Sequence, residues 1–205
     1  MQGYIININR VKEEDLIVTI LTKNSIKTLY RFYGARHSTI NLGYKIDFES
    51  LPSMKSSIPQ LRSILQLGYQ WNSDMGRMFI WQPFIRLFYL HLKDIATIDA
   101  FYFSLLEECT LVWHKQNPKR VAIEAYVKIL EFEGRLHDDF ICFNCDEVIE
   151  EDLTLIRSFL PAHQKCAWNS TLHHLHVKEL FEHKSTILLD DNEIETLWKI
   201  LQEGF

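Results

Sequence analysis

The sequence predicts an α+β protein in which a small all-β domain precedes a helical domain. Apolar residues alternate with a period of two before about residue 75 and recur at helical spacing after it. Five of the seven glycines lie in the first 76 residues. Glycine (7) and proline (5) are scarce among the 205 residues, at about half their usual share, which favours helix in the remainder.

Five short segments near the N-terminus are predicted to be strands, because their apolar or β-branched residues alternate and polar turns separate them. These segments are residues 4–8, 16–22, 26–33, 44–48 and 64–71. Five short strands joined by short turns are typical of a small barrel or sandwich. We therefore expect an all-β domain over residues 1–75.

The remaining residues, 76–205, are predicted to form a helical domain. Apolar residues follow i, i+3, i+4 spacing in four stretches, and three of these have a recognisable start. Asp99 and Asp190 can cap a helix, and Asn117 followed by Pro118 is a further helix start. The four predicted helices cover roughly residues 75–92, 97–113, 117–130 and 190–201.

The formal net charge of −5 argues at first against a nucleic-acid binder, because such a protein must neutralise phosphates. The charge is uneven, however. Residues 1–80 carry ten basic and six acidic side chains, a net charge of +4, whereas residues 81–205 carry 12 basic and 21 acidic ones, a net charge of −9. The all-β domain can therefore meet phosphates, and we expect modest binding confined to one face.

The third predicted strand carries the candidate nucleic-acid surface. Strand alternation places the even-numbered residues of 26–32, which look like core, opposite the odd-numbered ones. The odd-numbered face contains Lys27, Arg31 and Tyr33, two cations and an aromatic ring that could hold phosphates and stack a base. The alternative is a solvated sheet face, on which lysine and arginine discourage edge-to-edge pairing.

Two pairs of potential metal ligands lie in the second half of the chain. Cys142 and Cys145 form a C-x2-C pair, and after 17 further residues His163 and Cys166 form an H-x2-C pair. Two such pairs can surround a tetrahedral Zn²⁺, and four protein ligands leave no open position, so the site would be structural. The alternative is a set of unrelated buried cysteines.

A histidine cluster is the other candidate for metal chemistry. His173, His176 and Glu179 could share one face of a helix, although ordinary surface histidines are the favoured interpretation. The sequence contains no P-loop, dinucleotide-binding glycine motif, nucleophile elbow or H-E-x-x-H motif. We therefore expect a protein that is not an enzyme.

Neither a signal peptide nor a membrane span is predicted. The opening residues lack the basic and apolar regions of a signal peptide. The most apolar stretch, residues 78–92, is interrupted by Gln82, Pro83, Arg86 and His91, whereas a span needs about 20 predominantly apolar residues. We expect a cytoplasmic protein with reduced cysteines, which favours metal over disulfides.

Three N-terminal segments together resemble the RecO family of bacterial recombination mediators. The segments are Gly3-Tyr4-Ile5-Ile6, the run from Glu13 to Thr22, and Gly34-Ala35-Arg36-His37-Ser38. The order of parts is also similar, with a barrel, a helical domain and a cysteine-pair insertion after a helix like 125–134. His163 stands where the family has a cysteine in its second pair.

The resemblance implies a five-stranded oligonucleotide-binding (OB-fold) barrel, a helical domain and a small zinc-finger-like insertion over residues 138–167. It implies DNA repair and homologous recombination without catalysis. Family members bind single- and double-stranded DNA, anneal strands and act with RecR to load RecA onto DNA coated by single-strand-binding protein (SSB), and they also bind the acidic C-terminal tail of SSB. Such a protein would be associated with the nucleoid.

Carried onto this sequence, the resemblance implies particular site residues. The DNA-binding residues would be Lys12, Lys27, Arg31, Tyr33, Arg36 and Lys45. The ligands of a structural Zn²⁺ would be Cys142, Cys145, His163 and Cys166. For the SSB tail, the helical half offers only Lys119 and Arg120 as basic candidates.

Two other functions compete with a recombination mediator. One is a protein-interaction adaptor whose barrel docks another protein and touches DNA weakly. The other is a zinc-dependent hydrolase that uses His173, His176 and Glu179, which would need a metal with an open coordination position.

Overall fold

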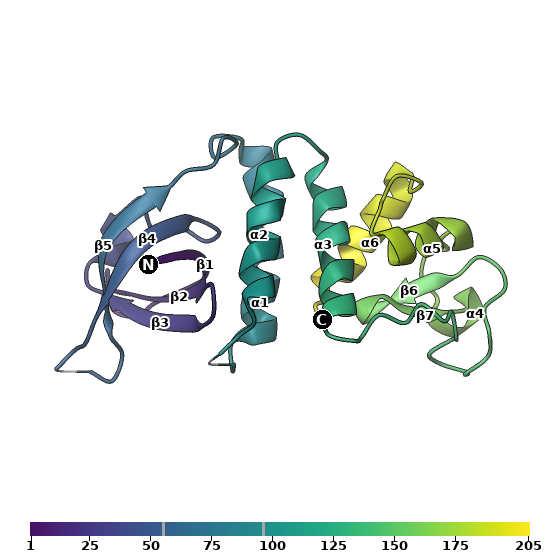
Figure 1. The fold of residues 1–205 in the computed structure, drawn as a ribbon, viewed down its shortest axis with the longest axis horizontal. Coiled ribbons are helices and arrows are strands. Elements are labelled where there is room, and N and C mark those ends of the chain that lie inside the picture. The colour runs from purple at the N-terminus through teal and green to yellow at the C-terminus, as the bar shows by residue number, and fades with distance from the viewer. Residues whose placement is uncertain (55, 96) are drawn as a thin grey trace. The chain divides into compact units, whose positions relative to one another are not determined.

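The computed structural model describes residues 1–54, 56–95 and 97–205, which divide into two units, Met1–His114 and Lys115–Phe205. Among the described residues, the first unit contains five strands, two α-helices and the short 3₁₀ helix Gly34–Arg36, and the second contains helices and a two-stranded hairpin (Figure 1). Within the described ranges, no helix is both long and apolar enough to cross a membrane.

The five N-terminal strands close into a barrel in the order β1-β2-β3-β5-β4. The strands are β1 (Gln2–Arg10), β2 (Leu16–Thr22), β3 (Ile26–Arg31), β4 (Lys45–Leu51) and β5 (Gln60–Leu67). Neighbouring strands are antiparallel except β3 and β5, which run parallel and are paired at Tyr30 and Gln60. This is the closed five-stranded arrangement of an OB-fold, so the predicted fold of this region is confirmed.

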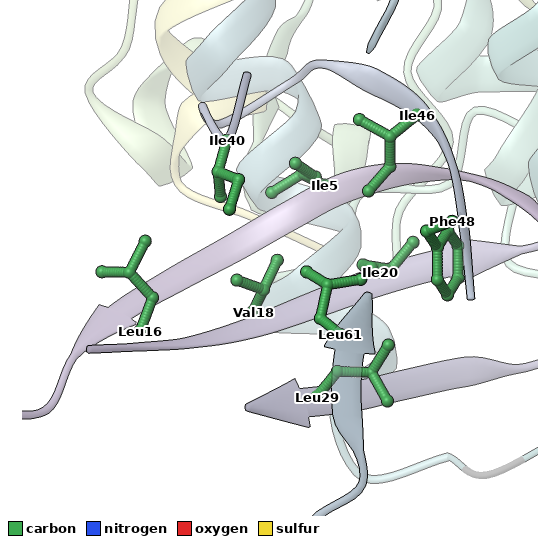
Figure 2. Packing of buried hydrophobic residues seen from close by; sticks show 9 residues of the cluster. All are labelled: Ile5, Leu16, Val18, Ile20, Leu29, Ile40, Ile46, Phe48 and Leu61. Atoms are coloured by element: carbon green, nitrogen blue, oxygen red, sulfur yellow. The ribbon is translucent and has the colours of Figure 1, made fainter. Parts of the chain in front are cut away.

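Alternating residues from all five strands fill the barrel, and Figure 2 shows them pointing into one interior. In β2, for example, every second residue is part of this core, as the strand period requires. The buried cluster consists of Ile5, Leu16, Val18, Ile20, Leu29, Ile40, Ile46, Phe48 and Leu61. Because each strand contributes to it, the core fixes the register of the whole barrel.

The face of β3 that packs against the barrel core is not the face that was predicted to do so. Leu29 pairs with Val18, and opposed residues of an antiparallel pair point to the same side. Leu29 is accordingly 1% exposed, whereas Thr28 and Phe32 of the predicted core face are exposed. The prediction was wrong because only the middle of this short strand lies over the core, so one leucine suffices and Lys27 and Arg31 lie towards the strand ends.

The fifth strand begins and ends four residues earlier than the predicted 64–71. Tyr69 and Trp71 leave the sheet and stack on each other, with ring centroids 4.5 Å apart. Both rings pack against Trp81 of the following helix. Burial of large aromatic surface in this cluster outweighs continuation of the strand.

Two helices complete the first unit, namely α1 (Met75–Leu92) and α2 (Ala100–Val112). Asp99 caps α2 as predicted, since its carboxylate accepts the backbone N–H of Phe101. The boundary between the two compact units lies after His114, whereas the strands are followed by helices from about residue 75. The division at 75/76 into separate domains, and the insertion 138–167, stay predictions.

The second unit is built around α3, whose start was predicted. Asn117 caps this helix and Pro118 occupies its first turn. Asp190 and Glu193 form a capping box at the start of α6, also as predicted. The elements of this unit are α3 (Pro118–Phe132), β6 (Thr154–Ile156), β7 (Leu160–Ala162), α4 (Gln164–Ala167), α5 (His174–His183) and α6 (Asp191–Gln202).

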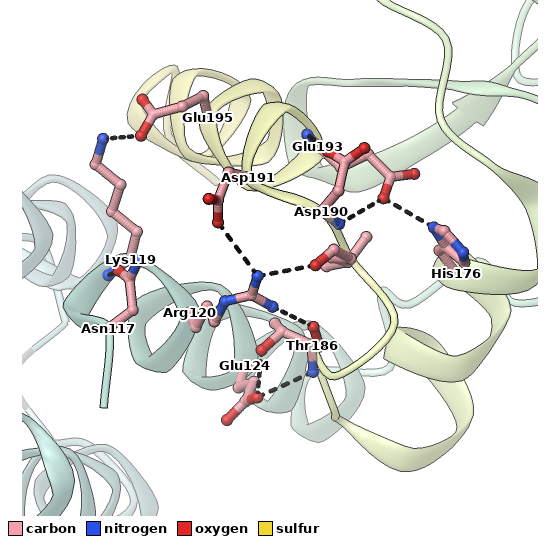
Figure 3. Close-up of polar contacts among 11 residues, drawn as sticks. Asn117, Lys119, Arg120, Glu124, His176, Thr186, Asp190, Asp191, Glu193 and Glu195 are labelled. Carbon is pink, nitrogen blue, oxygen red and sulfur yellow. Dashed lines mark hydrogen bonds and ion pairs between the residues drawn. The ribbon is translucent and has the colours of Figure 1, made fainter. Parts of the chain in front are cut away.

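The basic pair Lys119 and Arg120 is engaged within this unit (Figure 3). Lys119 forms an ion pair with Glu195 of α6. The Arg120 guanidinium donates to the carbonyl oxygens of Thr186 and Leu189, the latter at 2.8 Å. These contacts hold the segment before α6 against α3. Because both cations are engaged in them, neither is available to bind an acidic peptide.

Candidate nucleic-acid interface and metal centre

Three adjoining hollows surround the end of β3 on the barrel, and we call them together the β3-end surface. Their volumes are about 360, 420 and 480 Å³. The first two share Phe32 and Gln60, and the first and third share His37, so they form one continuous surface. The surface combines cations with exposed rings, the combination that suits a single nucleic-acid strand.

The second hollow lies between the β1–β2 loop and the segment that joins β4 to β5. Lys12 lines one side, and Ser56 and Ile58 line the other. Between them lie Tyr30 and Phe32, whose ring centroids are 4.8 Å apart in an edge-to-face arrangement. In OB-folds these two loops and the face of β2 and β3 are where oligonucleotides bind.

Asp15 holds the exposed aromatic end of β3 in place. One carboxylate oxygen accepts the Tyr30 hydroxyl at 2.5 Å, and the other accepts the backbone N–H of Tyr33 at 2.8 Å. The Tyr30 hydroxyl, followed by that N–H, lowers the pKa of Asp15 below its ordinary value. Tyr33 adopts a left-handed backbone conformation, which is uncommon for a bulky residue, and the residue is 59% exposed.

Arg36 is held by Glu14 beside the Tyr33 ring. Arg36 Nη2 lies 2.5 Å from Glu14 Oε2, and the guanidinium carbon lies 5.1 Å from the ring centroid. The hydrogen bond and the charge of Glu14 raise the pKa of Arg36. A phosphate that approaches Arg36 must therefore compete with this carboxylate.

Four of the six predicted DNA-binding residues line the β3-end surface, namely Lys12, Arg31, Tyr33 and Arg36. The structure does not bring the other two to it. Lys27 lies near the opposite end of β3 from Arg31. Lys45 is turned towards α2, where its Nζ lies 2.7 Å from Glu107 Oε2 and its side chain is only 17% exposed.

Sequence reasoning missed several residues of this surface. Phe32 was assigned to the core, and Arg62 and Gln60 of β5 were not singled out. Arg62 and Gln60 carry no local signal, because β5 reaches β3 only through the parallel closure of the barrel. Phe32 was predicted to be buried because it is apolar, but sequence alone does not distinguish an exposed ring from a buried one.

The four predicted metal ligands converge on one point of the second unit. The ligand atoms of Cys142, Cys145, His163 and Cys166 all lie within 4.8 Å of one another, so these residues could hold a metal ion. Cys145 Sγ lies 3.4 Å from His163 Nδ1. The backbone N–H of His163 donates to Cys142 Sγ at 3.4 Å. Three sulfurs and one imidazole are a donor set that suits a closed tetrahedral site.

Local turns position both ligand pairs. Asp146, the residue after Cys145, has φ +58° and donates its N–H to the Cys142 carbonyl oxygen at 2.9 Å. Aspartate tolerates this left-handed conformation better than most residues, so glycine is not needed here. Asn144 ties the two pairs together, because its side-chain amide donates to the Cys166 carbonyl oxygen at 2.8 Å.

The electrostatics of the cluster make one thiol acidic. Burial alone would raise the pKa of Cys142, but backbone N–H groups of His163, Asn144 and Cys145 outweigh it and lower that pKa to about 6. Burial, with the neighbouring cysteine sulfurs, raises the pKa of Cys166 to about 11. A bound cation would favour the thiolate at every cysteine of the cluster.

The residues considered for a hydrolase do not form a comparable group. His176 Nδ1 lies 2.8 Å from Glu193, and Glu179 is 3.9 Å from His183. Across the part of the chain that the structure describes, the Cys142 cluster alone brings three or more potential ligands close enough to share one ion. The geometry therefore gives no support to a catalytic metal at His173, His176 and Glu179.

Comparison with known families adds one finding. Residues 1–72 match the family model described as RecO N terminal. No curated protein matches the chain. The matched segment contains all five strands of the closed barrel and every residue that lines the β3-end surface. This match supports a RecO-family protein, because residues 1–72 are similar to a RecO N-terminal domain.

Proposed function

We propose that this protein is a non-catalytic mediator of DNA repair and homologous recombination whose barrel binds DNA at the β3-end surface. The observation that carries the proposal is the continuous surface on which Lys12, Arg31 and Arg36 surround the exposed rings of Phe32 and Tyr33. Cations hold phosphates while rings stack unpaired bases. Unpaired bases held in this way remain available for annealing.

The resemblance supports more specific roles for the same protein. We propose that it anneals complementary strands, binds double-stranded DNA as well, and acts with RecR to load RecA onto SSB-coated DNA. We also propose that it binds the SSB tail, although Lys119 and Arg120 are paired internally and are not suggested as that contact. The protein would then lie at the nucleoid. For the cysteine cluster we propose a structural Zn²⁺.

Titration with labelled single-stranded DNA at two salt concentrations tests the DNA proposal. We expect that a double variant, Lys12→Gln with Arg36→Gln, weakens binding and reduces the dependence of log affinity on log salt by about 0.7 per lost phosphate contact. The control is Arg86→Gln, which removes an exposed charge from α1. Binding that is undetectable at physiological salt would contradict the proposal and favour the protein-interaction adaptor.

Removing the carboxylate of Glu14 is expected to strengthen DNA binding. Glu14→Gln breaks the ion pair with Arg36 and removes a negative charge that repels phosphate, so affinity for single-stranded DNA should rise roughly two- to five-fold at low salt. The backbone contact of Glu14, which accepts the Ala35 N–H at 2.9 Å, is unaffected. Fluorescence anisotropy measures the change.

The neighbouring residue supplies the control for this variant. Glu13→Gln removes the same charge from the same loop, but Glu13 has no ion pair to Arg36 in the described structure. An equal gain from both variants would mean that net charge alone matters. It would contradict a competition between Glu14 and phosphate for Arg36.

A further inference from the structure

The first hollow of the β3-end surface contains two guanidinium groups. Arg31 and Arg62 both line it, and among the described residues neither forms an ion pair. Glu49 is opposite Arg62 in the pairing of β4 with β5, but its carboxylate accepts the Ser63 hydroxyl at 2.7 Å instead. The hollow therefore brings together two positive charges that form no ion pair among the described residues.

Arg31 is fixed in the wall of this hollow. Its Nη1 donates to the Leu61 carbonyl oxygen at 3.1 Å, and its Nη2 lies 3.4 Å from His37 Nε2. Its Nε is buried without a hydrogen-bond partner among the described residues. Burial, followed by the positive charge of Arg62, lowers the pKa of Arg31. Like charges held together in this way are relieved by a bound anion.

Arg62 is also held in a defined orientation. Its Nε and Nη2 donate to Gln60 Oε1 at 3.2 and 2.8 Å, and the other guanidinium N–H groups have no partner among the described residues, so they can donate to a ligand. The exposed rings of Phe32 and Tyr33, at 47% and 59% exposure, complete the rim of the hollow. A planar guanidinium matches the geometry of phosphate oxygens, so the pair is suited to that anion.

We propose that Arg31, Arg62 and His37 bind a phosphomonoester dianion, such as the terminal phosphate of a DNA strand. Two guanidiniums match the two charges of a monoester, whereas an internal phosphodiester carries only one. In a hollow of about 360 Å³, a terminal group can present its free oxygens while the adjoining base stacks on the rim. Recognition of a strand end would make the DNA-binding function proposed above more specific, and it rests on that function.

Three forms of one internally labelled oligothymidine test this site on the full chain. They carry a 5′-phosphate, a 3′-phosphate, or hydroxyl groups at both ends. We expect one phosphorylated form to bind roughly three- to ten-fold more tightly than the hydroxyl form. Arg62→Gln and Arg31→Lys should abolish this difference, whereas Arg86→Gln should preserve it. Equal binding of all three forms would overturn the site and leave the DNA-binding function standing.

Thymidine 5′-monophosphate and inorganic phosphate distinguish a strand end from a free anion. We expect both to compete only weakly with the phosphorylated strand, since they lack the stacked neighbouring bases. A direct calorimetric titration with thymidine 5′-monophosphate covers the case in which the hydroxyl-ended strand does not bind. In that case, nucleotide binding that is lost in Arg62→Gln would support the phosphate site and contradict the strand-binding function. If neither the strands nor the nucleotide bind, both the site and the DNA-binding function are overturned.

Discussion

Replacing Trp81 with alanine is expected to lower the free energy of unfolding of the first unit by about 3–5 kcal/mol. Trp81 is fully buried, and its indole N–H donates to the Gly43 carbonyl oxygen at 2.8 Å. Its ring packs against Tyr4 of β1 and Trp113 after α2. Alanine would leave a large cavity where α1 meets the barrel and would remove one of the two hydrogen bonds that the Gly43 carbonyl oxygen accepts, the other coming from the Tyr69 hydroxyl at 2.8 Å.

Hydrogen exchange read by mass spectrometry localises this effect to the first unit. We expect Trp81→Ala to lose amide protection in β1, β4 and α1, while the Lys115–Phe205 unit keeps its protection. Trp168→Ala is the control, because Trp168 is 90% exposed and its removal should cost little. Protection of β1 equal to that of the unchanged protein would contradict this account of the helix–barrel contact.

Gly43 provides a second test of the same contact. This residue has φ +84°, and a Cβ placed on it would lie 2.6 Å from Trp81 Cδ1. Gly43→Ala therefore introduces both backbone strain and a collision with a fully buried ring. It should destabilise the same strands as Trp81→Ala.

Loss of Cys142 is expected to destabilise the second unit strongly. Cys142→Ser should lower the zinc content of the purified protein well below one equivalent and reduce the thermal midpoint of this unit by about 10 °C or more. Cys142 is fully buried and belongs to the four-residue ligand cluster. The ligands tie together segments with short elements of their own, such as the three-residue strands β6 and β7.

A second buried cysteine makes the control specific. Cys109 is 3% exposed in α2 and is not part of the cluster, so Cys109→Ala should retain about one equivalent of zinc. Elemental analysis and thermal unfolding with and without a chelator measure both effects. Unchanged protein that holds less than about half an equivalent of zinc with an intact fold would contradict a structural metal at this site.

Much of the candidate metal centre and of the helical caps was predictable from sequence. The spacing of Cys142, Cys145, His163 and Cys166 is a local signal, because each pair needs only one turn to bring its ligands together. Asn117 and Asp190 likewise act on N–H groups within three residues. Such features depend on residues that are close in the sequence, so they can be predicted without knowledge of the fold.

The candidate DNA-binding surface was only partly predictable, because its members meet across the barrel. Sequence alternation defined the two faces of β3, but the pairing of Leu29 with Val18 decided which face lies inside. The parallel closure of β3 on β5 brought Arg62 to Arg31, which precedes it by 31 positions. Lys45 was drawn to Glu107 by a contact that no local pattern contains.

The sequence by itself therefore determined the order of the five N-terminal strands and of α1, α2, α3 and α6, the positive charge of residues 1–80 and the set of potential metal ligands. It did not predict β6, β7, α4 and α5. Hydrophobic period, capping and ligand spacing are short-range properties, and a short segment is enough to express them. Only the tertiary structure decided the inward face of β3, the exposure of Phe32 and the pairing state of each cation. These outcomes depend on which side chains, distant in sequence, pack in the same core or form an ion pair. Those contacts are established only when the tertiary structure forms.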